Sequence, residues 1–156
     1  DLFNDSEGVL YAEIAALADD GTFRQLAIGN STDNVKLLYT GVATSIRFIV
    51  KDGGVNQYDK TINVPDIDYH KVALKYKASD FAVYIDGFEY EAQASGTTPS
   101  GLAELAFDDG AGGSDFYGKT KAVAVFKEAL TDAELENLTS WVSFTQMATD
   151  LEYTLE

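Results

Sequence analysis

The 156-residue chain contains no cysteine, only two prolines, and a single histidine and tryptophan. The absence of cysteine excludes a disulfide framework and a thiolate metal site. His70 is the only histidine, and no Ser–His–Asp or Cys–His arrangement stands out in the sequence. The glycine-rich run at residues 110–113 is not followed by a helical pattern, which excludes a phosphate-binding loop there.

Basic residues are also scarce. Lys and Arg total 11 against 26 Asp and Glu, and the formal net charge is −15. Nucleic acids select concentrated positive charge, so we expect no nucleic-acid partner. No run of about 18 apolar residues is present, and we therefore expect no membrane insertion. The acidity indicates a well-solvated surface, with divalent-cation binding or a high-salt environment as the alternatives.

Short stretches in which apolar and polar residues alternate are abundant, and Gly, Asp and Asn separate them. A period of two predicts half-buried antiparallel strands. We expect such strands at residues 8–18, 22–29, 35–39, 44–50, 55–64, 102–107 and 119–126. The spacing of these strands predicts an all-β fold, a two-sheet antiparallel jelly-roll sandwich.

A hairpin at residues 69–90, YHKVALKYKASDFAVYIDGFEY, is the clearest pattern in the chain. Its core-facing residues are predicted to be Val72, Leu74, Tyr76, Phe81, Val83 and Ile85. Ala78, Ser79 and Asp80 form the polar break between the strands, and the Asp86-Gly87 pair predicts a second tight turn. We expect Leu74 and Val83 to be fully buried neighbours across the hairpin.

A helix is predicted at residues 127–138. Thr131 and Glu134 have the spacing of a capping box, and Leu130 and Leu135 have the spacing of a hydrophobic staple. We expect residues 1–140 to form the sandwich domain. Residues 141–156 form a C-terminal tail in which Phe144, Met147, Ala148 and Leu151 predict a short amphipathic helix packed on the domain.

The hairpin resembles the central hairpin of laminin G-like and pentraxin-like domains, which read W-H-x-V-A-x-x-Y, a turn, and L-Y-V-D-G. The matching residues are His70, Val72, Ala73, Tyr76, Val83, Tyr84, Ile85, Asp86 and Gly87. Tyr69 stands where Trp is usual. The segment from Phe126 to Leu135 is similar to the group's closing R-A-L-S-x-x-E-I motif.

This resemblance covers about residues 8–140 and implies a concanavalin-A-like lectin/glucanase sandwich. The layout is also similar to domains in bacteriophage tail and virion proteins and in surface proteins of marine Bacteroidota. Glycosidases of this fold carry an E-x-D-x-E or E-x-D-x-x-E strand, which the chain lacks. The nearest carboxylate pair, Glu89 and Glu91, has no intervening Asp, and we expect the domain not to be an enzyme.

Sugar binding calls for exposed aromatic faces beside polar groups. The off-core face of the hairpin carries Tyr84, Lys75 and Asp86. Arg47 points outward from its own strand, because Ile46, Phe48 and Val50 face the core. Tyr58 and Tyr90, near loops, complete the ligand-binding candidates. Packing at the edge of the sandwich is the alternative role for each tyrosine.

The loop at residues 107–118, FDDGAGGSDFYG, gathers three carboxylates among glycines. Asp108, Asp109 and Asp115 are hard oxygen ligands of the kind that calcium binds. Calcium is therefore a candidate cofactor, and a solvated acidic loop is the alternative. In glucanases of the group a calcium-binding Asp often precedes the last strand, but Lys119, Thr120 and Lys121 occupy that position here.

These observations favour a non-catalytic, lectin-like carbohydrate-binding module. We expect it to belong to a larger extracellular or phage virion protein, to act in adhesion at the extracellular or virion surface, and to bind a polysaccharide or cell-surface glycan. It would also contact other domains or subunits of its parent assembly. A purely structural assembly module and a polysaccharide-active enzyme with an unrecognised site remain the alternatives.

Overall fold

The computed structural model describes residues 2–140, which form ten strands and one helix. The strands are β1 (Glu7–Ala16), β2 (Arg24–Gly29), β3 (Asn34–Tyr39), β4 (Ser45–Asp52), β5 (Val55–Asn63), β6 (His70–Lys77), β7 (Phe81–Ile85), β8 (Phe88–Gln93), β9 (Leu105–Ala106) and β10 (Gly118–Phe126). The helix is α1 (Asp132–Ser140). No helix in this part of the chain is long and apolar enough to cross a membrane.

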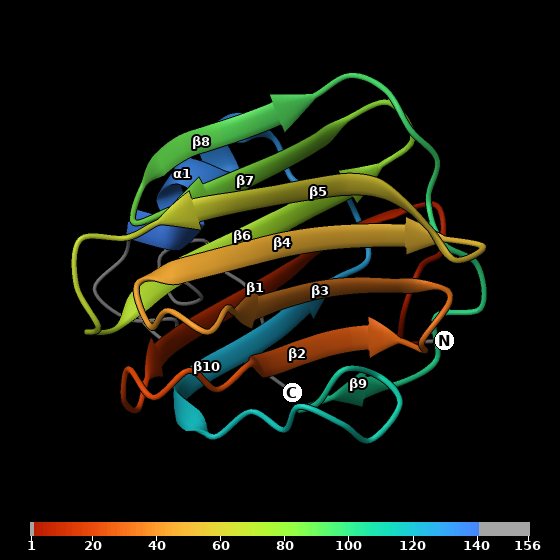
Figure 1. Ribbon diagram of the computed structural model, residues 1–156. Coiled ribbons are helices and arrows are strands. Elements are labelled where there is room, and N and C mark those ends of the chain that lie inside the picture. Colours follow the sequence, from red (N-terminus) through yellow and green to blue (C-terminus); the bar gives the residue numbers. More distant parts are fainter. Residues whose placement is uncertain (1, 141–156) are drawn as a thin grey trace.

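The strands form two five-stranded antiparallel sheets that lie as two layers (Figure 1). The first sheet has the order β10-β1-β6-β7-β8, and the second has the order β5-β4-β3-β2-β9. Neighbouring strands in each sheet are often far apart in sequence, as in the pairing of β1 with β10. This arrangement confirms the predicted two-sheet jelly-roll sandwich.

The core lies between the sheets and is built from alternate residues of each strand. In the first sheet, Leu10, Ala12, Ile14 and Ala16 of β1 face inward, as predicted. Leu74 of β6 lies opposite Val83 of β7, and both side chains are fully buried. The predicted hairpin register is therefore confirmed.

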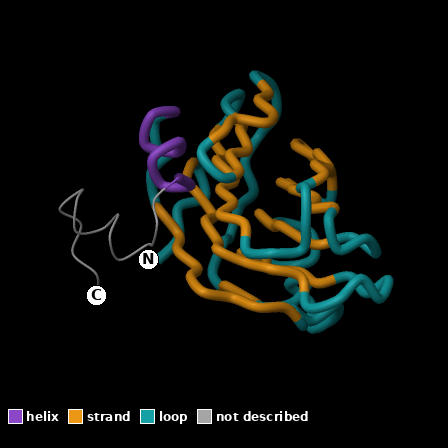
Figure 2. The backbone as a smooth tube through the Cα atoms, turned by 90° about the vertical axis from the view of Figure 1, so that its left-hand side faces the viewer, coloured by secondary structure: helices purple, strands orange, loops and turns teal. Residues whose placement is uncertain are grey.

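Helix α1 covers the outer face of the first sheet (Figure 2). Leu135 and Leu138 of the helix pack with Val9, Tyr11 and Tyr84 of the sheet in a second buried cluster. This cluster exists because the outer-face residues of β1, β6 and β7 are apolar enough to need a cover.

The start of α1 has the predicted capping box. The amide of Thr131 donates to Glu134 Oε2 over 2.7 Å, and the amide of Glu134 donates to Thr131 Oγ1 over 3.4 Å. Leu130 packs against the same cluster as Leu135, which agrees with the predicted staple.

Three elements differ from the sequence prediction. The helix α1 begins at Asp132, directly after its N-cap Thr131, and not at residue 127. The strand β8 was not predicted, because an extra residue at Tyr90, between the pairs Val83–Glu91 and Tyr84–Glu89, interrupts its own alternation. The predicted strand at residues 102–107 is reduced to the two residues of β9. The predicted amphipathic helix within residues 141–156 lies outside the described residues.

Candidate functional site

The outer face of the first sheet was predicted to expose a binding surface, and this prediction is wrong. Tyr84 is 1% exposed beneath α1, and its hydroxyl donates to Glu89 Oε2 over 2.6 Å. Burial is the main cause that raises the pKa of this hydroxyl, and the bond to Glu89 adds to it. Lys75 is also buried, and its ammonium lies 2.8 Å from Asp80 and 3.4 Å from Asp132 of the helix.

Two further candidates, Tyr58 and Asp86, contact other residues of the domain, and a third, Tyr90, is exposed to solvent. Tyr58 is 1% exposed and stacks on Phe81 with ring centroids 5.8 Å apart, so its predicted exposure is wrong. Asp86 lies in the turn after β7, where its carboxylate accepts from His70 and from the backbone of Lys71. Tyr90 on β8 is 45% exposed, and its role in binding stays a prediction.

Arg47 points outward from β4, as predicted, and it does so on the outer face of the second sheet. Its guanidinium forms a bidentate ion pair with the carboxylate of Asp59 on β5, with an Nε–Oδ1 distance of 2.7 Å. Asn56 donates a further bond to Asp59 over 2.7 Å. These bonds raise the pKa of Arg47 and lower the pKa of Asp59.

The strand register determines which residues surround Arg47. One cross-strand row of this outer face runs through Ala106, Ala27, Lys36, Ile49 and Asp59. The adjacent row runs through Gln25, Leu38, Arg47 and Thr61. We call the surface formed by Gln25, Ala27, Lys36, Leu38, Arg47, Ile49 and Asp59 the Lys36 face.

The Lys36 face has an apolar floor and polar edges. Ala27, Leu38 and Ile49 point away from the core, yet they are 0%, 3% and 5% exposed. The long side chains of Lys36 and Arg47, both half-buried, stand among them. No helix of residues 2–140 packs on this face, in contrast to the outer face of the first sheet.

The loop at residues 107–117 borders the Lys36 face. The amide of Gln25 donates to the Ser114 carbonyl over 3.1 Å, which holds the loop against β2. A hollow of about 340 Å³ opens where this loop meets β9, lined by Glu104, Ala106, Asp108, Gly110, Ala111 and Gly112. Since Ala106 pairs with Ala27, the hollow adjoins the row that contains Lys36.

The three carboxylates predicted to bind calcium serve the loop itself. Asp108 accepts from the amide of Gly110, and Asp109 accepts from the amides of Ala111 and Gly113. Asp115 accepts from the Tyr117 hydroxyl over 3.0 Å. Within residues 2–140, no three His, Cys, Asp or Glu side chains are arranged to hold a metal ion. Calcium binding here stays a prediction.

Lys36 carries the least compensated charge of the face. Its pKa is lowered, first by burial and then by the positive charge of Lys51, while Asp109 opposes the shift. The alternation of β3 indicated that Lys36 points outward, since Val35, Leu37 and Tyr39 face the core. The sequence did not show that β4 would place Arg47 in the next row, so Lys36 was missed as a candidate.

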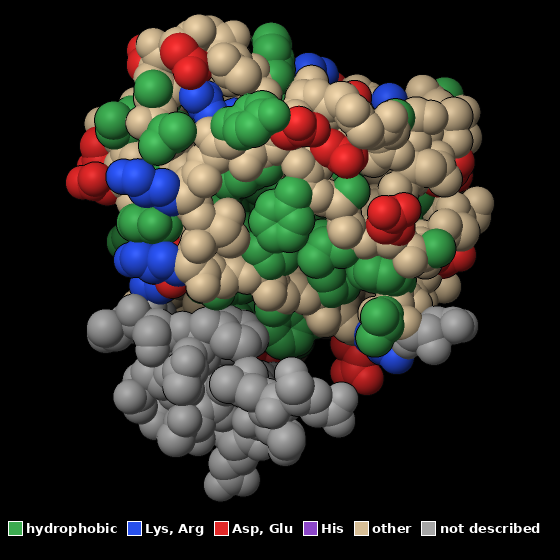
Figure 3. Space-filling view, turned by 90° about the horizontal axis from the view of Figure 1, so that it is seen from below, with side chains coloured by type: hydrophobic (Ala, Val, Ile, Leu, Met, Phe, Trp, Pro, Cys, Tyr) green, Lys and Arg blue, Asp and Glu red, His purple; other side chains and the backbone are tan. Residues whose placement is uncertain are grey.

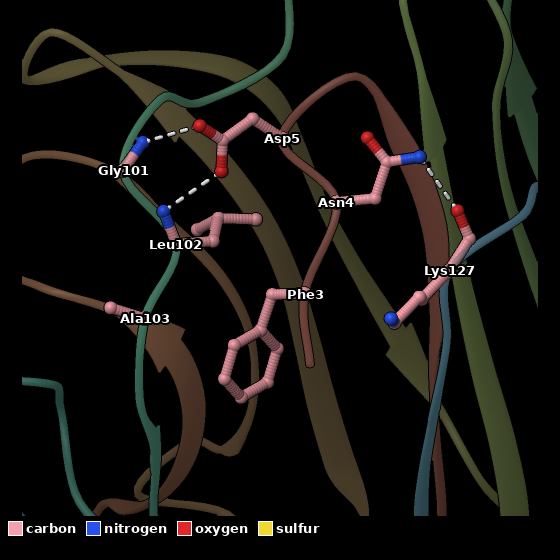
Figure 4. A pocket seen from close by; sticks show the side chains of 7 residues that line it. All are labelled: Phe3, Asn4, Asp5, Gly101, Leu102, Ala103 and Lys127. Atoms are coloured by element: carbon pink, nitrogen blue, oxygen red, sulfur yellow. Dashed lines mark hydrogen bonds between the residues drawn. The ribbon is translucent and has the colours of Figure 1, made fainter. Parts of the chain in front are cut away.

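A larger hollow, of about 650 Å³, lies where the N-terminal segment meets residues 101–103 (Figure 4). Asp5 points at the backbone there and accepts from the amides of Gly101 and Leu102 over 2.7 and 2.9 Å. Asn4 donates to the Lys127 carbonyl over 2.8 Å. Because these polar groups anchor the segment, we regard this hollow as a structural junction.

Hydrophobic side chains gather on the lower end of the molecule (Figure 3). Phe107 and Phe116 contact edge to face, with ring centroids 6.4 Å apart, at the two ends of the loop. Phe107 is 48% exposed, and Tyr117 is 64% exposed. The same loop therefore presents aromatic surface at its ends and borders the Lys36 face along its middle.

The fold and this face can be compared with known proteins. The sequence profile of the concanavalin A-like lectin/glucanases superfamily matches residues 6–136. The chain belongs to this superfamily. The predicted resemblance to the group is thereby confirmed. No curated protein matches the chain significantly in sequence.

Solved structures of similar fold include carbohydrate-binding modules. The CBM40 module of the Ruminococcus gnavus IT-sialidase bound to α2,3-sialyllactose has a TM-score of 0.71 and 16% identity, over 88% of this chain and 84% of that one. Domain 4 of the Geobacillus stearothermophilus extracellular arabinanase AbnA, in complex with arabinotriose, has a TM-score of 0.66 and 13% identity, over 88% and 68%.

A leech intramolecular trans-sialidase is also similar, with a TM-score of 0.69 and 17% identity. The match covers 90% of this chain but only 24% of the leech chain. At these identities the likeness to this superfamily's solved members concerns the fold alone.

Proposed function

We propose that the chain is a non-catalytic, lectin-like module that binds a glycan on the Lys36 face. The observation that carries the proposal is the contrast between the two outer faces. Helix α1 buries Tyr84 and Lys75 on the first sheet, whereas no helix of residues 2–140 packs on the second sheet, and Lys36 and Arg47 there keep part of their side chains in solvent.

This arrangement suits a sugar ring. The C–H groups of a sugar pack on apolar surface, and its hydroxyls need a few well-placed polar partners. The aliphatic stems of Lys36 and Arg47, which are half-buried above Leu38 and Ile49, supply the apolar surface. Arg47 and Asp59 hold each other in place, so both groups are already positioned to bond hydroxyls before a ligand arrives.

The carboxylate pair that a glycosidase would need is divided between the faces. Glu89 accepts from the buried Tyr84 hydroxyl, beneath α1. Glu91 lies 3.6 Å from Lys60 of β5, in the other sheet. The register shift within the β7–β8 pair explains why residues two apart take different partners. This division supports a binding role over hydrolysis.

The relatives support a carbohydrate ligand by analogy. Two modules of the same fold are bound to sialyllactose and arabinotriose in their own structures. We propose that this module, too, is part of a larger protein at the extracellular or virion surface, where it attaches its parent assembly to a polysaccharide or cell-surface glycan.

A glycan array followed by calorimetry tests the proposal. We expect binding with a Kd between about 1 µM and about 1 mM. Arg47→Ala should weaken it at least about tenfold, because it removes one hydroxyl partner and releases Asp59. Lys119→Ala, an exposed change on β10 in the other sheet, is the matched control and should leave the affinity unchanged.

The alternatives give different results in the same experiment. Loss of binding in Tyr90→Ala with no change in Arg47→Ala would move the site to β8. No binding to any glycan of a broad panel would support the structural-module alternative. Release of smaller sugars from a bound polysaccharide would instead support an enzyme.

A further inference from the structure

Lys36 differs from the other buried cations of residues 2–140. The guanidinium of Arg24, 2% exposed, bonds Asp20 over 2.8 Å and two backbone carbonyls. Lys75, 6% exposed, lies between Asp80 and Asp132. Lys36 is half-buried, yet none of the ion pairs within 4.0 Å in this part of the chain includes it.

Asp109 and Asp59 offset the charge of Lys36 in part, but neither forms an ion pair with it within 4.0 Å. Asp59 is held by Arg47 and Asn56. Asp109 accepts two backbone amides of its own loop. Lys51 and Arg47 repel the ammonium, as the lowered pKa of Lys36 reflects after the larger effect of burial.

Partly desolvated charges are normally paired, since losing hydration without a partner costs free energy. An anion that binds beside such a cation supplies the missing partner, and this pairing favours the complex. Lys36 lies in the row between Ala27 and Ile49, and its side chain is partly exposed, so a ligand on this face would meet it.

We infer that the ligand of the Lys36 face is an acidic glycan, whose carboxylate or sulfate pairs with Lys36 while its ring lies on the aliphatic stems of Lys36 and Arg47. This inference rests on the proposed glycan-binding function. The attraction acts only at contact distance. At long range the net charge of −15 repels an acidic polymer. Recognition therefore depends on this one short-range pair more than on electrostatic steering.

Matched glycan pairs test the inference by calorimetry. The pairs are polygalacturonate against its methyl ester, sialyllactose against its methyl ester, and dextran sulfate against dextran. We expect the acidic member of at least one pair to bind at least about tenfold more tightly. The first two pairs report on a carboxylate, and the third reports on a sulfate.

Variants test whether Lys36 causes the preference for the acidic member of a pair. Lys36→Met keeps the aliphatic chain but removes the charge, and it should erase the preference for the acidic member. Lys36→Arg should retain most of it. Lys119→Met removes the same charge from an exposed position on β10 in the first sheet, and it should leave the preference intact.

Stability provides an independent readout. Because no ion pair of residues 2–140 includes Lys36, Lys36→Met should unfold at the same temperature as the parent or a higher one. A melting temperature lowered by several degrees would overturn the inference, since it would reveal a partner for Lys36.

The binding results distinguish a failure of this inference from a failure of the proposed glycan-binding function. Equal or tighter binding of neutral members, with Lys36→Met unchanged, would overturn the inference and leave the glycan-binding module standing. A preference for acidic glycans that survives Lys36→Met would also overturn it. No binding to any member would overturn both.

Discussion

His70 Nδ1 lies 2.6 Å from Asp86 Oδ2, and this contact joins the start of β6 to the turn that follows β7. The other ring nitrogen, Nε2, lies 3.4 Å from Asp66 Oδ1 in the segment before β6. His70 is 4% exposed, and Asp86 also accepts from the Lys71 amide over 2.9 Å. The histidine and aspartate of the hairpin motif therefore form a clamp in which His70 is buried and Asp86 is exposed.

This clamp predicts a pH-dependent stability. The bond to Asp86 raises the pKa of His70 despite burial, and Asp66 adds a smaller effect. Its contribution to the free energy of unfolding is present below the unfolded pKa of about 6.5, and is lost as pH rises through the folded pKa. Burial opposes the shift of Asp86, but the bonds from His70 and Lys71 lower its pKa, so its contribution is lost only at strongly acidic pH.

Urea unfolding between pH 5.5 and 8.5 measures this effect. His70 is the only histidine of the chain, and the α-amino group is the other group that ordinarily titrates in this range, so a loss of stability that Asp86→Asn abolishes belongs to His70. Asp86→Asn should flatten the dependence, whereas Asp66→Asn should reduce it only slightly. A parent protein whose stability does not change across the range would contradict the prediction.

Leu74→Asp tests the hairpin register. The change places a carboxylate opposite Val83 in the core, and we expect a cost of several kcal/mol, roughly the whole stability of an ordinary domain. Thr120→Asp, on an exposed position of β10, should change stability by less than about 0.5 kcal/mol. Circular dichroism melts compare the two, and similar melts would mean that the register is wrong.

Substitutions of Tyr84 test whether this side chain serves packing or ligand binding. Tyr84→Phe removes the bond to Glu89 and should cost about 1 kcal/mol, while Tyr84→Ala leaves a cavity beneath α1 and should cost about 3–5 kcal/mol. Neither change should alter glycan affinity in the protein that remains folded. Weaker binding by a fully stable Tyr84→Phe variant would place the ligand on the helix-covered sheet.

Calcium at the loop of residues 107–118 stays a prediction. Binding would require Asp108 or Asp109 to exchange backbone amides for the ion. If the site forms, 10 mM calcium should raise the melting temperature by the equivalent of roughly 1.4–2.7 kcal/mol for a Kd of 10⁻⁴–10⁻³ M, and magnesium should do less. Asp108→Asn with Asp115→Asn should abolish the difference. Equal effects of the two ions would indicate charge screening alone.

Local patterns in the sequence determined much of the fold. Alternation assigned the inward residues of β1, β3, β4, β6 and β7, because a period of two leaves only one face for the core. The T-x-x-E spacing located the start of α1, since a capping box is satisfied by residues three apart. These features depend on residues that are close together in the chain, so they can be predicted from the sequence.

The tertiary structure decided which outward face is covered. Tyr84 and Lys36 both sit on off-core positions of their strands, and alternation cannot distinguish them. Tyr84 is buried because α1, which begins more than forty residues later, docks on the first sheet. Lys36 stays in reach of solvent beside Arg47 because β3 pairs with β4, and no helix of residues 2–140 covers that pair. The exposure of a side chain depends on the packing of distant segments, which local sequence patterns do not encode.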